Sequence, residues 1–236
     1  MLEKAVGIIG GVGPLSTVYF MDMIIKMTDA KKDQDHINMV VLNHATIPDR
    51  TDFILGKSLE SPLPVMVSDA IKLQNAGADF IVMPCNTAHY FFNKIKESVS
   101  IPMLNIVEET VEYAIKKIKN LNTIGILATD GTLVSSTYQR VCDKKGIKCV
   151  APNKEQQKCV MNLIYNQVKA GKSADIMTFY EIMQDLLDQG CQAVILGCTE
   201  LSVIKKDFKL DLPYIVDSLE VLARKTILTC NKQIRE

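Results

Sequence analysis

One short pattern occurs twice in this chain: a glycine, a turn, four apolar residues and a cysteine with a threonine close behind. The first copy runs from Gly77 to Cys85 and the second from Gly190 to Cys198. Four consecutive apolar residues are typical of a parallel strand that is covered on both faces. Each cysteine is therefore expected beyond the carboxyl end of a strand and before a helix. Open α/β sheets bind ligands at this position, and a helix amino terminus lowers the pKa of a thiol.

A second pair of similar segments indicates an internal duplication. Residues 5–14 parallel residues 123–132, and the offset is close to that between the cysteines. Two halves of similar build predict an α/β fold of two pseudo-twofold-related lobes, each a mainly parallel sheet flanked by helices. We expect the active site in the interlobe cleft, with one cysteine from each lobe. The first lobe is predicted to comprise residues 1–104 and 217–236, and the second residues 105–216.

The apolar periodicity predicts the elements between these motifs. Strands are expected over residues 5–9, 39–43, 80–83, 101–104, 123–127, 147–150, 193–196 and 213–215. Helices are expected over residues 15–30, 63–74, 107–119, 133–145, 160–169, 174–189 and 219–231.

Composition excludes several classes of partner. The chain of 236 residues has 27 basic and 27 acidic side chains, so it offers no basic field for a nucleic acid or an acidic membrane surface. No apolar run approaches the length of a membrane span. Seven cysteines without a close CxxC pair argue for a reducing cytoplasm rather than for disulfides or a metal site.

Two facing cysteines suit a particular kind of chemistry. A single nucleophilic cysteine needs a histidine base, and His89, one helical turn past Cys85, fits a structural role as well as a catalytic one. Inversion of a carbon centre instead needs one group to remove a proton from one face and another to supply a proton to the opposite face. A thiolate at one cysteine and a thiol at the other meet this need without a cofactor. The remaining cysteines are expected to be small buried hydrophobes: Cys142, Cys149, Cys159, Cys191 and Cys230.

Other residues fall on the same predicted rim. Backbone N–H groups at Asn86-Thr87 and at Thr199-Glu200 are placed to neutralise a carboxylate. The Gly10–Pro14 loop lacks the ending of a P-loop, so we expect its amides to face a small carboxylate rather than a phosphate. Thr129 gives a hydroxyl at another carboxyl-end turn. Arg50 is either a surface arginine paired with a neighbouring aspartate or a clamp on a substrate carboxylate, and the residues alone favour the surface arginine.

The two cysteine motifs resemble those of the aspartate/glutamate racemase family. Residues 84–89 and 197–201 carry the resemblance, and residues 10–14, 47–51, 124–129 and 168–171 also fit. The resemblance is greatest to the aspartate racemase branch. It implies two α/β lobes, an interlobe active site, no cofactor and a homodimer.

The same resemblance implies roles for individual residues. Cys85 and Cys198 are then the acid/base pair, and Asn86 and Thr87 hold the α-carboxylate. Arg50 and Lys169 would bind the carboxylates of the substrate, although Lys169 alone reads as a solvated helix end. Val12 stands where the family often carries methionine, which implies a smaller wall beside the substrate.

The leading hypothesis is therefore racemisation of an acidic amino acid, aspartate before glutamate. Relatives of the same fold isomerise maleate, decarboxylate aryl malonates or racemise hydantoins. Two basic residues favour a substrate with two carboxylates, which disfavours hydantoins and leaves maleate open. A protein that only binds a dicarboxylate is the alternative from another class, but such a protein has no need of two thiols at matching helix starts.

Overall fold

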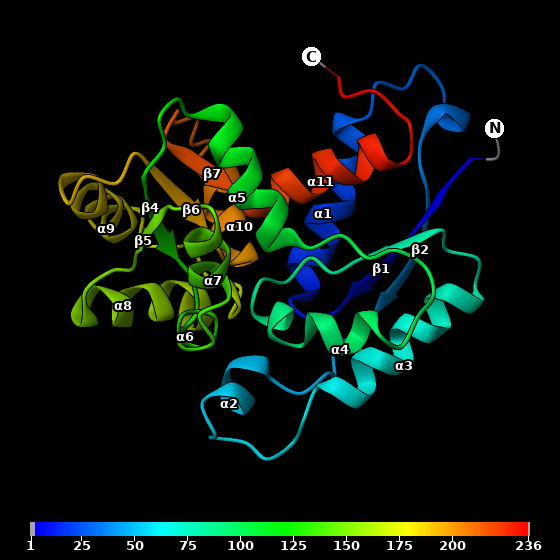
Figure 1. Cartoon of the computed structure of the whole chain (residues 1–236), viewed down its shortest axis with the longest axis horizontal. Coiled ribbons are helices and arrows are strands. Elements are labelled where there is room, and N and C mark those ends of the chain that lie inside the picture. The colour runs from blue at the N-terminus through cyan, green and yellow to red at the C-terminus, as the bar shows by residue number, and fades with distance from the viewer. Residues whose placement is uncertain (1–2, 236) are drawn as a thin grey trace.

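The computed structural model describes residues 3–235, which form two parallel sheets (Figure 1). The first sheet has the order β2-β1-β3, and the second has the order β5-β4-β6-β7. All the paired strands are parallel. In the second sheet, β5, β4 and β6 take the places that β2, β1 and β3 have in the first, and β7 is added beside β6. The strands are β1 (Ala5–Gly10), β2 (Asn38–Asn43), β3 (Phe80–Val82), β4 (Thr123–Leu127), β5 (Lys148–Val150), β6 (Ala193–Leu196) and β7 (Ile215–Asp217). The predicted fold of two parallel-sheet α/β units is confirmed.

Several helices begin where the sequence supplies capping side chains. Asn105, Asn153, Asp175 and Asp217 each accept backbone N–H groups at a helix start. The helices are α1 (Pro14–Met27), α2 (Arg50–Ile54), α3 (Leu63–Asn75), α4 (Phe92–Lys96), α5 (Ile106–Lys117), α6 (Asp130–Val134), α7 (Thr137–Lys144), α8 (Lys154–Met161), α9 (Ile176–Asp188), α10 (Thr199–Asp207) and α11 (Ser218–Thr229). Short 3₁₀ segments, η1 (Asp33–Asp35) and η2 (Thr87–Phe91), and one π-helix, η3 (Asn162–Val168), complete the chain.

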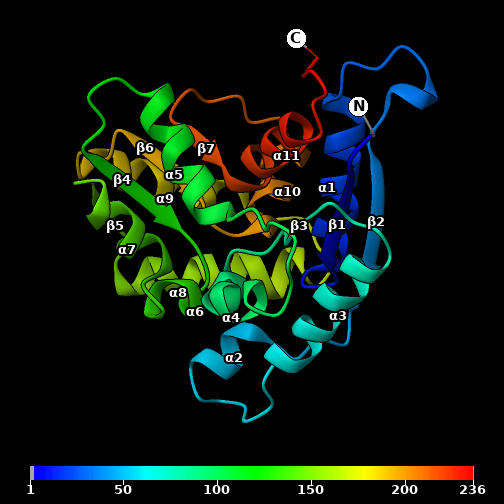
Figure 2. The same cartoon turned by 45° about the vertical axis from the view of Figure 1, so that its right-hand side comes forward.

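A shared core joins the two sheets. Helices α1, α5 and α11 lie between them, and Figure 2 shows α1 and α11 side by side there. Alternate residues of β1 face this core (Val6 and Ile8), and they belong to the same buried cluster as Ile124 and Ile195 of the second sheet. Separate clusters cover the other face of each sheet. The two lobes therefore hold one another in place.

Helix α11 packs on α1, α5 and α10, as expected for a helix that returns to the first lobe. Its contacts with α5 and α10 also tie it to the second lobe. The lobe boundaries at residues 104/105 and 216/217 stay a prediction.

Two predicted elements differ in the structure. Residues 101–104 form only a single bridge, between Met103 and Ile81, rather than a strand. Pro102 lacks an N–H to continue a ladder, and Asn105 caps α5 directly afterwards. The helix expected over 133–145 is divided into α6 and α7, because Ser136 takes a left-handed conformation with φ of 53°.

The region between Val150 and Lys169 also differs from the prediction. A helix was expected to start at residue 160, but α8 begins at Lys154, where Asn153 and Gln156 form a capping box. The chain then continues as the π-helix η3, which was not predicted. Such π-helical segments are frequent at functional sites.

The lobes pack tightly against one another at Gly131 in α6. A Cβ atom at this position would lie 2.9 Å from Thr51 Cα and 3.1 Å from Thr87 Cγ2 of the first lobe. The backbone of α2 cannot yield as a flexible side chain can. The absence of a side chain at residue 131 therefore allows the cleft to close.

We predict that Gly131→Ala, and more strongly Gly131→Val, will hold the lobes apart. Amide hydrogen exchange should become faster in α2 and η2, because their packing against α6 is lost. Exchange in β4 and β6 should be unchanged and serves as the internal control. Equal acceleration in the sheet would mean global destabilisation and would contradict this account of Gly131.

Candidate active site

All ten sequence-predicted site residues line one cavity between the lobes. They are Val12, Arg50, Cys85, Asn86, Thr87, Thr129, Lys169, Cys198, Thr199 and Glu200, and the structure adds Asp49, Thr51 and Tyr165. The cavity volume is about 10 Å³, which is the room that one water molecule needs. The two candidate thiols thus line the same small space.

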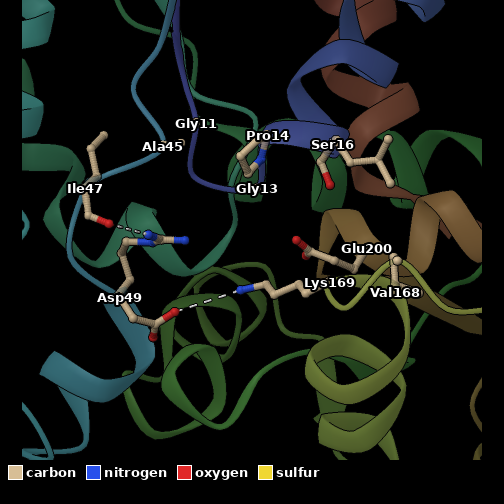
Figure 3. Close-up of a pocket in the computed structure, with 13 residues that line it drawn as sticks. Gly11, Gly13, Pro14, Ser16, Ala45, Ile47, Asp49, Val168, Lys169 and Glu200 are labelled. Atoms are coloured by element: carbon tan, nitrogen blue, oxygen red, sulfur yellow. Dashed lines mark hydrogen bonds and ion pairs between the residues drawn. The ribbon is translucent and has the colours of Figure 1, made fainter.

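A larger chamber of about 500 Å³ lies beside this cavity (Figure 3). Asp49, Arg50, Lys169 and Glu200 line both spaces. The other walls of the chamber come from the start of α1, the loop after β2 and the end of η3. Figure 3 shows the Lys169 side chain directed into the chamber toward Asp49.

The Gly10–Pro14 loop packs tightly against protein. Gly11 has φ of +82°, and a Cβ atom there would lie 2.2 Å from the His44 backbone. Its N–H donates to Thr17 Oγ1 at 3.0 Å, so this amide does not face a ligand. A Cβ on Gly13 would lie 2.9 Å from Glu200 Oε1, and Val12 reaches the cavity itself. The loop therefore shapes the cavity wall by close approach, and the amide of Gly11, which was expected to face a carboxylate, is instead bonded to Thr17.

Cys85 follows β3 and is 6% exposed. The helix after it begins as the 3₁₀ segment η2, not as an α-helix. His89 Nδ1 donates to the Cys85 carbonyl oxygen at 2.8 Å, and its Nε2 accepts the Ile106 N–H at 3.1 Å. Both ring nitrogens are thus used by backbone groups, and burial lowers the pKa of His89 to about 4. Of the two roles left open for His89, the structure supports the structural one.

Cys198 stands at the amino terminus of α10 and is 5% exposed. Its Sγ donates to Glu200 Oε2 at 3.0 Å. Burial and the Glu200 carboxylate raise the pKa of Cys198 well above its usual range, while Lys169 acts in the opposite direction. The expectation of a pKa lowered by the helix terminus is therefore wrong for Cys198, because burial and the adjacent carboxylate outweigh the helix dipole. Cys198 is a thiol at neutral pH.

Side chains from both predicted lobes hold Asn86, and threonines of the second lobe hold Thr87. The Asn86 amide donates to Ser218 Oγ at 2.9 Å and accepts the Tyr138 hydroxyl at 2.7 Å. Thr87 Oγ1 lies 2.9 Å from Thr129 Oγ1 and 3.0 Å from Thr132 Oγ1. These contacts orient the Asn86 side chain at the cavity wall, and its role toward a substrate carboxylate stays a prediction.

Arg50 is the first residue of α2 and is only 7% exposed, so the surface-arginine alternative is wrong. Its Nη1 donates to the carbonyl oxygens of Ile47 at 3.3 Å and Pro48 at 3.2 Å. Its buried Nε has no partner among residues 3–235. The backbone carbonyls orient the guanidinium and leave donors for a ligand.

Lys169 follows the π-helix η3 and interacts with two residues that sequence reasoning did not select. Its Nζ lies 3.9 Å from the Asp49 carboxylate and 4.1 Å from the centre of the Tyr165 ring. The Tyr165 hydroxyl donates to Asp49 Oδ2 at 3.2 Å. Asp49 lies in the 47–51 motif, where it was considered only as an ion partner of Arg50. The one sequence signal for Tyr165 is its position four residues before Lys169.

The other five cysteines fit the prediction in part. Cys142, Cys191 and Cys230 are buried, Cys149 is half-buried, and Cys159 is exposed. Within residues 3–235, no group of three or more His, Cys, Asp or Glu side chains is arranged to hold a metal ion. None of the helices in that range has the length and apolar character to cross a membrane.

Comparison with known proteins shows the family. The profile described as Asp/Glu/Hydantoin racemase matches residues 9–226, and the chain belongs to this family. A broad-specificity amino-acid racemase, RacX, of Bacillus subtilis is 30% identical over 95% of this chain and 97% of its own. The structure of Picrophilus torridus aspartate racemase has a TM-score of 0.80 and 33% identity, covering 98% of this chain and 96% of that chain. An aspartate racemase homologue from Pyrococcus horikoshii has a TM-score of 0.77 and 26% identity, covering 97% and 99%. These relatives are amino-acid racemases or their homologues, and this chain is an isomerase of that kind.

We predict that the His89 imidazole will stay neutral, as the Nδ1–H tautomer, in NMR spectra down to about pH 5 and will titrate near pH 4. The unfolded chain binds a proton at the ordinary pKa near 6.5, so this residue lowers the stability of the fold as the pH falls from about 6.5 to 4. A titration midpoint near 6.5 in the folded protein would contradict the buried geometry.

We also predict that Glu200→Gln will shift the alkylation of Cys198 to lower pH, because the substitution removes the negative charge that opposes the thiolate. Burial should still keep the pKa above that of an exposed cysteine. Iodoacetamide rates measured from pH 6 to 10, in a Cys85→Ser background, would test this. An unchanged profile would show that Glu200 does not control this thiol.

Proposed function

We propose that this protein is a cofactor-independent racemase that inverts the α-carbon of an acidic amino acid, aspartate before glutamate. The observation that carries the proposal is the enclosure of Cys85 and Cys198, one from each lobe, in a single small cavity with Arg50 and Lys169. The similarity to an aspartate racemase over nearly the whole chain supports the choice of substrate.

The two cysteines would work as unequal partners. The Cys85 thiolate removes the α-proton from one face of the substrate, so that the C–H bond breaks and an S–H bond forms. The Cys198 thiol, held protonated beside Glu200, gives its proton to the opposite face and becomes the thiolate. For the other enantiomer the same steps run in reverse, so no redox partner or external base is consumed.

The cavity supplies positive charge where negative charge develops. Loss of the α-proton places charge on the α-carboxylate, and the N–H groups at the starts of η2 and α10 are placed to stabilise it. Arg50 would hold one carboxylate of the substrate and Lys169 the other. The enclosed space strengthens these interactions because water competes little with them.

Glu200 favours an amino acid over maleate as the substrate. Glu200 is 5% exposed and lines both the cavity and the chamber. An α-ammonium group would balance this charge, whereas maleate has no cation to offer. A homodimer in the cytoplasm stays a prediction from the sequence.

We predict that the wild-type protein, without added cofactor, will exchange and invert the α-hydrogen of aspartate in D2O. Cys85→Ser and Cys198→Ser should each reduce inversion by at least about a hundredfold, the lower end of what a positioned acid or base contributes. NMR and a chiral assay on both enantiomers of aspartate and glutamate would measure this. Cys159→Ser, an exposed cysteine outside the cavity, is the matched control.

The proposal fails if the wild type neither exchanges nor inverts any of these four substrates. Maleate is included in the same experiment, and its conversion alone would identify a dicarboxylate isomerase instead. Retained inversion in either serine variant would contradict the two-base mechanism.

A further inference from the structure

The enclosed cavity has no room for its substrate. Its volume of about 10 Å³ suits one water molecule, and an amino acid is several times larger. Entry therefore requires the walls of the cavity to move, and the contacts that cross the cleft oppose this movement. The relevant contacts are those between the small cavity and the adjoining chamber, because the chamber is the larger space beside the cavity.

One cluster bridges the cleft at that side. Asp49 belongs to the first lobe, and Tyr165 and Lys169 belong to the second. Asp49 Oδ1 accepts the Asp52 N–H at 3.0 Å as the cap of α2, while both carboxylate oxygens accept the Tyr165 hydroxyl, at 3.3 and 3.2 Å. Lys169 lies 3.9 Å from the same carboxylate, at the outer limit of an ion pair. Figure 3 shows the Lys169 side chain extended across the chamber toward Asp49.

The carboxylate of Asp49 is ionised and keeps partners of its own. Burial would raise its pKa, but the Asp52 N–H, Lys169 and Arg50 lower the pKa by more. If Lys169 turned away, the cap N–H and the Tyr165 hydroxyl would still satisfy Asp49. The Lys169 ammonium can therefore move away from Asp49 at little cost in free energy, and a carboxylate of the substrate could become its new partner.

We propose that Asp49 and Tyr165 form a latch that closes the empty cleft and that Asp49 holds Lys169 until the side-chain carboxylate of the substrate takes its place. The inference rests on the proposed function for the identity of the substrate. It makes Asp49 and Tyr165 positioning residues that set specificity. An amino acid with an uncharged side chain has no carboxylate that could replace Asp49 as the partner of Lys169. The exchange of partners therefore favours substrates with two carboxylates.

Two variants separate the parts of the latch. Asp49→Asn removes the charge that holds Lys169 but keeps an oxygen for the α2 cap and for Tyr165. Tyr165→Phe removes the hydroxyl and keeps the ring beneath Lys169. Asp52→Asn removes a neighbouring charge in the same helical turn without touching the cavity, and it is the matched control. Circular dichroism verifies that each variant is folded.

The first measurement is iodoacetamide alkylation of Cys85 and Cys198 in the substrate-free protein, located by mass spectrometry. Asp49→Asn and Tyr165→Phe should each react about two- to fivefold faster than wild type, the range expected for a partly exposed contact of this kind. Asp52→Asn should react as wild type does. Unchanged alkylation in both latch variants would overturn the proposal.

The second measurement compares kcat/KM for aspartate with that for asparagine, which has the same shape and no second charge. Asp49→Asn should reduce the preference for aspartate, mainly by improving the KM for asparagine. An unchanged preference would overturn the specificity role. Because alkylation requires no turnover, faster alkylation in an enzyme inactive on both amino acids would contradict the proposed function and still support the latch.

Discussion

Two thiols can act on opposite faces of one carbon only if their strands end at the same small space. The shared core between the sheets imposes this condition. Helices α1, α5 and α11 fill the volume between β1–β3 and β4–β7, and the buried residues on those faces form one continuous cluster. Because each sheet is parallel, the carboxyl ends of its strands gather at one edge. The core therefore directs both edges, and with them both cysteines, into the same cleft.

Within this near-symmetric frame the two cysteines have different surroundings. Cys85 is followed by the 3₁₀ segment η2, in which both ring nitrogens of His89 bond to backbone groups. Among the described residues, no carboxylate is hydrogen-bonded to the Cys85 thiol. Cys198 begins an α-helix and donates to Glu200. One buried carboxylate thus favours the thiol form at Cys198 and has no hydrogen-bonded counterpart at Cys85 among the described residues. An acid/base pair of identical side chains needs such a difference.

Local patterns in the sequence predicted the fold and the positions of the two cysteines, whereas Arg50 and Lys169 were expected beside them only through the family resemblance. Buried runs such as Val194–Leu196 mark strands, and the cysteines that follow them mark the functional edge. The contact between Asp49 and Tyr165 could not be predicted, because it joins residues far apart in the sequence and Tyr165 lies in the unpredicted π-helix η3. The raised pKa of Cys198 was missed for a related reason. A helix amino terminus lowers the pKa of a thiol, but burial in the closed cleft raises the pKa of Cys198, and this burial cannot be seen in the sequence.

The central claim is that two separate groups carry the two protons, and the isotope content of the first product tests it directly. L-Aspartate would be converted in D2O and stopped after a few percent of reaction, and the α-hydrogen of each enantiomer would be measured by mass spectrometry after chiral separation. Two thiols predict D-aspartate that carries solvent deuterium in essentially every molecule, while the remaining L-aspartate keeps its protium. D-Aspartate that retains the original protium would mean that one group moves a single proton from face to face, and it would contradict the account.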